Sequence, residues 1–143
     1  MGRLFSMQVN KPFSYNKKEK LKSRKLIGQV FDGGRSFTVF PLKVFYIQPQ
    51  QAMDFCIKAG VGVSGRNFKK AVERNYIKRI LREAYRTEKG LLHNALQQQS
   101  RQAAIFILYI DKAMPAYSVV KEKMRAALLR LEKELNETVT KNN

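Results

Sequence analysis

The residues with the most distinctive chemistry in this sequence are the cations between residues 64 and 86. A row of them recurs at intervals of four residues, with no acid in the row: Arg74, Lys78, Arg82 and Arg86. On a helix, which turns by about 100° per residue, this row shares an arc of about 140° with Arg79 and Asn75. Solvated helix faces normally mix both signs, because like charges four residues apart repel each other. The row therefore predicts a polyanion against this face.

The residue types on this face suit RNA in particular. Guanidinium groups pair with phosphate oxygens in a bidentate manner and also stack on bases. The amide of Asn75 donates and accepts hydrogen bonds, as recognition of a base edge or a 2′-hydroxyl requires. Further cations stand at or just before the expected helix start, where free backbone N–H groups also favour phosphate: Arg66, Lys69 and Lys70. We expect all of these residues to contribute to one RNA-binding surface.

The composition of the whole chain agrees with a nucleic-acid partner. Its 28 Lys and Arg residues outnumber 11 Asp and Glu residues, which gives a net charge of +17. Phosphate contacts release condensed counterions, so nucleic acid is the favoured polyanion. An anionic membrane is less favoured, because the cations are spread over several elements, and no apolar run reaches the roughly 18 residues of a membrane span. The N-terminal residues have no signal-peptide core, and the single Cys56 fits a reducing compartment, so we expect a cytoplasmic protein.

The hydrophobic pattern predicts one α+β domain, a small two-layer sandwich with helices on a sheet. The expected elements, in order, are a helix over 19–31, a strand over 37–47, a strand over 53–64 antiparallel to it, a helix over 70–88, a helical tail and loop over 91–102, a strand over 103–110 and a helix over 118–136. Pro41 suggests an edge or a bulge in the first strand. Residues 1–18 are expected to form a flexible basic arm, 19–137 the RNA-binding domain and 138–143 a frayed tail.

Two details of this pattern concern packing. The helix over 70–88 is expected to bury the half opposite its cations: Val72, Tyr76, Ile77, Ile80, Leu81 and Ala84. Gly60 and Gly62 fall on one face of their strand and leave the backbone bare there. Either another group approaches closely at these glycines, or they mark a bulge or a packing gap.

The spacing Arg74-Asn75-x-x-Lys78-Arg79-x-x-Arg82 resembles the signature of the bacterial ribonuclease P protein component. The stretch from Leu26 to Gly34 is similar to the family's first helix and turn, and residues 61–64 and 71–72 fit its pattern too. The similarity covers roughly residues 20–135 and is strongest over residues 60–86.

This resemblance implies the fold of the second domain of ribosomal protein S5, with element order α-β-β-α-β-α, possibly one further short strand, and a left-handed β-α-β crossover. In the family the RNA subunit is the catalyst and acts through Mg²⁺ ions, which that RNA mainly holds. The implied function is assistance in removing the 5′ leader of precursor tRNA. The implied partners are the ribonuclease P RNA, with one protein per RNA, and the precursor tRNA.

The resemblance also implies roles for single residues. The arginines of the signature would face the RNA subunit: Arg74, Arg79, Arg82 and Arg86. Asn75 and Lys78 would lie toward a cleft that holds the leader, together with Ile27, Phe31 and Phe45. Both phenylalanines can stack on bases, although ordinary core packing would explain them equally well.

Three residues depart from the family pattern. Tyr76 stands where a second arginine is usual, Ile27 where an aromatic residue is common, and Gly65 where a lysine is common. Each departure puts a contact in doubt at its own position alone.

Two other functions compete with this interpretation. A ribosomal protein has the same size and charge, and the signature alone argues against it. A self-sufficient nuclease has little support, because the single histidine, His93, stands in a polar stretch where a surface position is expected, and the acids are scattered. No cluster of acids predicts the paired metals that protein nucleases often use.

Overall fold

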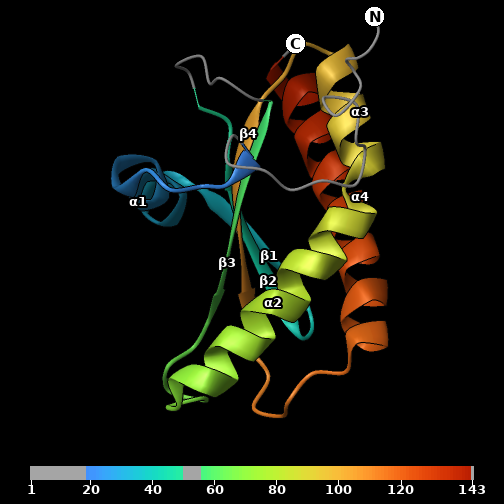
Figure 1. Ribbon diagram of the computed structural model, residues 1–143. Coiled ribbons are helices and arrows are strands. Elements are labelled where there is room, and N and C mark those ends of the chain that lie inside the picture. The colour runs from blue at the N-terminus through green and yellow to red at the C-terminus, as the bar shows by residue number, and fades with distance from the viewer. Residues whose placement is uncertain (1–18, 50–55, 143) are drawn as a thin grey trace, which may run out of the picture.

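The computed structural model describes residues 19–49 and 56–142 and contains a mixed sheet with helices on both faces (Figure 1). The elements, in order, are α1 (Arg24–Gly33), β1 (Arg35–Val39), β2 (Leu42–Ile47), β3 (Ile57–Val63), α2 (Ala71–Glu88), α3 (Gly90–Gln98), β4 (Ala103–Tyr109) and α4 (Tyr117–Asn142). The predicted α+β class is confirmed. Residues 1–18 and 53–55, for which an arm and the start of a strand were predicted, lie outside the described residues.

The sheet has the strand order β1-β2-β4-β3. The region predicted as one strand over residues 37–47 is a hairpin of β1 and β2, which turns at Phe40 and Pro41. A proline cannot donate to a strand ladder, so the chain turns there, and the possible extra strand is present. β2 pairs antiparallel with β4, and β4 pairs parallel with β3. The predicted strand over 53–64 thus runs opposite to β2, but β4 lies between the two.

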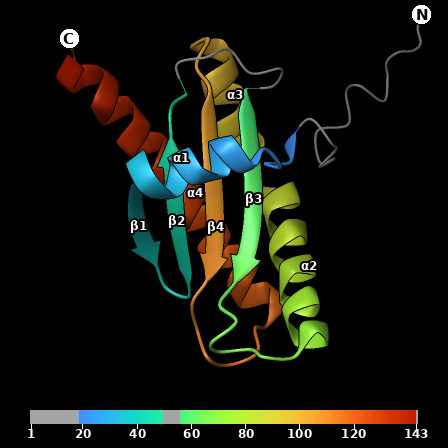
Figure 2. The ribbon, with the colours of Figure 1, turned by 90° about the vertical axis from the view of Figure 1, so that its left-hand side faces the viewer.

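The connection from β3 to β4 gives the fold its handedness. Figure 2 views the sheet from the side of α1, with β3 and β4 both pointing down and α2 behind them. In this view β4 lies to the left of β3, so the path from β3 through α2 and α3 to β4 is a left-handed crossover. Most such connections are right-handed. The rare hand that the family resemblance implied is confirmed.

The main core lies between the sheet and the layer of α2, α3 and α4 (Figure 1). The predicted apolar stripe of α4 is buried there: Met124, Leu128, Leu131 and Leu135. The helix continues to Asn142, six residues beyond its predicted end at residue 136. No glycine or proline occurs between those two positions, so the sequence contains no residue that would break the helix.

A smaller core lies on the other face of the sheet, under α1. Val30 is fully buried there, and Leu26 and Ile27 pack beside it. The helix begins at Arg24, later than the predicted residue 19, because the backbone before it pairs with the edge of β3, where the Leu21 N–H donates to the Ala59 carbonyl. Ser23 Oγ caps the helix by accepting from the Leu26 N–H at 3.3 Å.

The two glycines of β3 have a definite packing role. A Cβ atom on Gly62 would lie 2.7 Å from the ring of Phe106, and one on Gly60 would lie 3.0 Å from the same ring. The bare backbone of β3 therefore admits an aromatic side chain from the neighbouring strand β4. Of the two alternatives left open by the sequence, close approach of another group is confirmed.

Candidate nucleic-acid interface

The helix α2 is rotated about its axis by about 60° from its predicted orientation, at 100° per residue. Its buried residues are Ile77, Ile80, Leu81, Ala84 and Tyr85. The prediction was wrong for Val72 and Tyr76, which are 79% and 47% exposed, whereas Tyr85 is 1% exposed. A wheel misplaces Tyr85 because cations flank it, and long cationic side chains can leave a buried edge and reach solvent.

This rotation selects which cations stand at the centre of the solvent-facing surface. Arg79, Arg82 and Asn75 are exposed on α2. Arg79 and Arg82 have no carboxylate partner within the part of the chain that the structure describes. Each guanidinium can therefore offer its full set of donors to a phosphate without first breaking an ion pair.

Arg86 has a different environment on the same helix. Its guanidinium donates to both carboxylate oxygens of Glu83, at 3.1 and 2.5 Å. This hydrogen bond lowers the pKa of the Glu83 carboxyl, which therefore stays ionised at neutral pH. Glu83 compensates part of the positive charge at this end of the face, so Arg86 is a weaker candidate for a phosphate contact than Arg79 or Arg82.

Arg74 and Lys78 lie nearer the buried side of α2, and both are half-buried. Arg74 Nη1 donates to the carbonyls of Phe68 and Lys69, at 2.9 and 2.7 Å. Arg74 thus holds the loop that precedes the helix. The cations of that loop and of the helix start are exposed: Arg66, Lys69 and Lys70.

A cluster of aromatic rings forms a second candidate surface, on the α1 side of the sheet. The ring centroid of Phe31 lies 4.7 Å from that of Phe45 and 5.0 Å from that of Phe106. Phe31 is 42% exposed, and Lys43 Nζ lies 5.2 Å from the centroid of Phe45. We call Phe31, Phe45 and Phe106 the aromatic platform. Ile27 packs in the same cluster, so the structure brings together three residues that the family resemblance placed in the cleft.

Phe106 was missed by the sequence analysis, which assigned its apolar strand to burial on both faces. The residues of β4 in fact alternate, and Phe106 and Leu108 are half-buried on the α1 side. The available signal was the pair Gly60 and Gly62, for which close approach of another group was one of two open alternatives. The places of Asn75 and Lys78 in a leader cleft stay predictions, since α2 lies on the face of the sheet opposite to the platform (Figure 1).

Comparison with known proteins decides the family. A family model described as Ribonuclease P matches residues 15–132. This chain belongs to the ribonuclease P protein family. The ribonuclease P protein component of Porphyromonas gingivalis is 33% identical over 130 residues, which cover 91% of this chain and 95% of that protein. The corresponding protein of Chlorobium phaeobacteroides is 30% identical over 121 residues, covering 78% and 83% of the two chains.

Solved structures of ribonuclease P proteins have the same fold. The protein from Thermotoga maritima aligns with a TM-score of 0.62 at 25% identity, over 78% of this chain and 96% of that one. The protein from Staphylococcus aureus aligns with a TM-score of 0.59 at 19% identity, over 82% and 97% of the two chains. The chain is accordingly a protein subunit of ribonuclease P, an endoribonuclease complex of tRNA processing.

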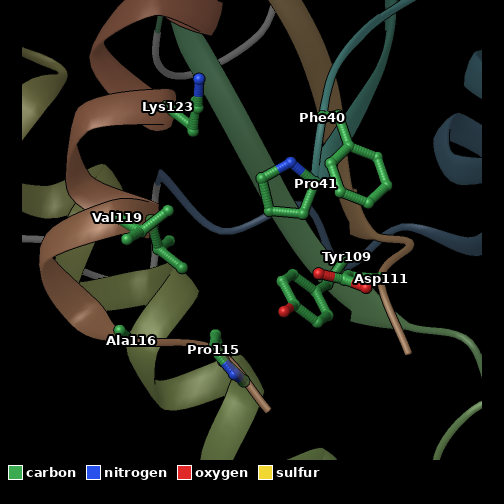
Figure 3. A pocket seen from close by; sticks show the side chains of 9 residues that line it. Phe40, Pro41, Tyr109, Asp111, Pro115, Ala116, Val119 and Lys123 are labelled. Atoms are coloured by element: carbon green, nitrogen blue, oxygen red, sulfur yellow. The ribbon is translucent and has the colours of Figure 1, made fainter. Parts of the chain in front are cut away.

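The ribonuclease P fold of this chain also contains a pocket, with a volume of about 350 Å³, between the β1–β2 turn and the start of α4 (Figure 3). Phe40, Pro41 and Val119 give it apolar walls. Its one carboxylate, Asp111, accepts hydrogen bonds from the backbone N–H groups of Lys112 and Ala113, at 2.6 and 3.3 Å, and so stabilises the local turn.

His93, the candidate base of a self-sufficient nuclease, is half-buried, not on the surface as predicted. Its Nδ1 lies 3.7 Å from Cys56 Sγ. The pKa of the His93 imidazole is lowered, mainly by burial and to a smaller extent by the charge of Lys89. Lys89 itself forms a buried ion pair with Glu19, which ties the segment before α1 to the junction of α2 and α3. His93 therefore belongs to a packed structural region and not to the basic face of α2.

In the described ranges 19–49 and 56–142, no three side chains of His, Cys, Asp or Glu gather closely enough to hold a metal ion. Among the described helices, none combines the length and the apolar character needed to cross a membrane.

Proposed function

We propose that this subunit binds the catalytic RNA of ribonuclease P through α2 and holds the 5′ leader of precursor tRNA on its aromatic platform. The observation that carries the proposal is the pair Arg79 and Arg82, which are exposed and have no carboxylate partner in the described part of the chain. Such a pair is suited to bidentate phosphate contacts. Arg66, Lys69 and Lys70 would extend that surface onto the preceding loop.

The platform supplies a different kind of contact from the basic helix. Exposed aromatic faces stack on unpaired bases without strong sequence preference, which suits leaders of varied sequence. Lys43, next to Phe45, would place a cation near the phosphates of the same strand. A single domain would thus bind a structured RNA through one layer and a single-stranded segment through the other layer.

In this proposal the protein is not the catalyst. The RNA subunit would carry out the hydrolysis with Mg²⁺ ions that it mainly holds, and these ions would supply charge stabilisation and an activated water. The protein would add affinity and position the substrate. We further propose one protein per RNA and action in the cytoplasm, where precursor tRNA is made.

Reconstitution tests this division of labour. We expect the purified protein alone to leave a 5′-labelled precursor tRNA intact at physiological Mg²⁺ concentration. The same protein mixed with a ribonuclease P RNA should release the leader as one labelled fragment, measured by gel electrophoresis. Cleavage by protein that is free of RNA would contradict the proposal. Copurification of ribosomal RNA, with no stimulation of ribonuclease P RNA, would favour a ribosomal protein instead.

Replacing Phe31 tests the platform. We expect Phe31→Ala to weaken binding of precursor tRNA to the reconstituted holoenzyme roughly ten-fold, because base stacking contributes about 1–3 kcal/mol. Binding of mature tRNA, which has no leader, should change little. Phe40→Ala is the matched control, since Phe40 is also an exposed phenylalanine but lies at the β1–β2 turn, outside the platform. An equal loss for both tRNAs would mean that Phe31 acts through folding alone.

A further inference from the structure

The solvent-facing side of α2 is divided into two chemically different halves. The C-terminal half presents Arg79, Arg82 and the paired Arg86. The N-terminal half presents no cation at its centre, because Arg74 is turned back toward the carbonyls of Phe68 and Lys69. Its exposed residues are Ala71, Val72, Asn75 and Tyr76. The first half suits phosphates, whereas the second offers an aromatic ring, an aliphatic side chain and an amide.

The exposure of Tyr76 is not explained by the packing of α2 against the rest of the protein. Its ring is 47% exposed, and it has neither a ring contact nor a hydrogen bond among the residues that the structure describes. Val72, one turn earlier on the same side of the helix, is 79% exposed. A valine and a tyrosine favour a helix less than a lysine or an arginine would at these positions. The pair is therefore slightly unfavourable on a free surface, and a partner that covers both side chains would offset this cost.

We propose that Tyr76, with Val72 beside it, is a stacking site for an unpaired base of the ribonuclease P RNA. The neighbouring Asn75 would contact the same nucleotide, at a base edge or a 2′-hydroxyl. The proposal rests on the proposed function, because it takes the RNA subunit as the partner of α2. It adds that this helix recognises a base as well as phosphates.

Charge and size both favour RNA as the occupant of this site. Two exposed side chains offer much less area than the roughly 800 Å² that each partner of a stable protein complex buries. A protein partner is therefore not favoured. The exposed cations Arg79 and Arg82 follow on the same helix, so phosphates of a bound strand can lie next to a base that covers Tyr76. The aromatic platform lies on the α1 side of the sheet, and α2 lies in the opposite layer (Figure 1), so the leader is not the expected occupant.

The salt dependence of binding separates stacking from a phosphate contact. We expect Tyr76→Ala to weaken binding of ribonuclease P RNA roughly ten-fold and to leave the slope of log affinity against log salt unchanged. Tyr76→Phe should bind like the wild type, because the ring remains. Arg79→Ala should also weaken binding but lower the slope by about one unit. Tyr76 is exposed, so its replacement should not impair folding, and thermal unfolding will verify this.

Fluorescence gives an independent measurement at the same position. The chain has no tryptophan, so Tyr76→Trp introduces a single indole at the proposed site. We expect its emission to be quenched when ribonuclease P RNA is added, whereas a Leu129→Trp control, at an exposed position on α4, should respond weakly.

Equal responses at the two positions, or wild-type affinity of Tyr76→Ala, would overturn the inference while the proposed function stands. Quenching by precursor tRNA but not by ribonuclease P RNA would overturn the assignment of the partner. Failure of the wild-type protein to bind ribonuclease P RNA would reject the proposed function and this inference together.

Discussion

The double replacement Arg79→Ala and Arg82→Ala is expected to weaken binding of ribonuclease P RNA on the order of a hundred-fold at physiological salt. Both guanidinium groups are exposed and lack an ion-pair partner in the described ranges. Each can therefore contact a phosphate without first breaking an ion pair. The slope of log affinity against log salt should fall by about two units, one for each lost contact. Filter binding or fluorescence anisotropy over a series of salt concentrations measures both quantities.

A matched control separates local contacts from the effect of net charge. The double variant Arg125→Ala and Lys133→Ala removes the same formal charge from exposed positions on α4. Arg125 already pairs with Glu88 at 3.1 Å, so its replacement removes a partly compensated cation. We expect the control to lose only a few-fold in affinity. Equal losses in the two double variants would show that the protein attracts RNA through its overall charge and that α2 has no special role.

The second large effect concerns Gly34, which joins α1 to β1. A Cβ atom at this position would lie 2.3 Å from the carbonyl oxygen of Val30 and 2.6 Å from that of Tyr46. Both oxygens belong to the backbone, one in α1 and one in β2, so neither can move unless the helix separates from the sheet. Overpacking of this kind costs about 1–3 kcal/mol and sometimes more. We expect Gly34→Ala to lower the free energy of unfolding by at least about 2 kcal/mol.

The neighbouring glycine provides the control for this prediction. A Cβ atom on Gly33 would meet nothing within 4 Å, so Gly33→Ala should change the free energy of unfolding by less than about 0.5 kcal/mol. Urea denaturation followed by circular dichroism compares the two variants directly. Because Phe31 lies in the last turn of α1, Gly34→Ala should also impair leader binding by more than it impairs binding of the RNA subunit. Similar stability of the two variants would contradict the close packing at Gly34.

The rotation of α2 shows where sequence periodicity stops being informative. A helical wheel predicts one apolar and one cationic half, and both halves exist. The wheel cannot predict whether Tyr76 or Tyr85 is buried, because each stands at the border of the two halves. Packing against β3 and α4 buries Tyr85 and leaves Tyr76 exposed. This choice turns Arg74 and Lys78 toward the buried side of α2 and leaves Arg79 and Arg82 exposed on the solvent-facing side.

The sheet shows a similar division. The aromatic and β-branched residues from 37 to 47 predicted extended structure, and the turn at Pro41 splits it into two strands. Local preferences contain no information about strand order, since pairing partners are distant in sequence. The insertion of β4 between β2 and β3 therefore depends on the tertiary structure alone. The same insertion places Phe106 between Phe31 and the bare backbone of Gly60 and Gly62, which creates the aromatic platform.

The sequence by itself determined the element types and most of their order, the basic character of α2 and the resemblance to the family, because these depend on residue types at short spacings along the chain. The signature from Arg74 to Arg82 is local in this sense. Its spacing is the same whichever face of the helix packs against the sheet. The tertiary structure decided which residues of α2 reach solvent, which aromatic rings meet, and which layer of the molecule carries each surface. Those outcomes depend on contacts between residues far apart in sequence, where close packing selects one arrangement among several that local preferences allow equally.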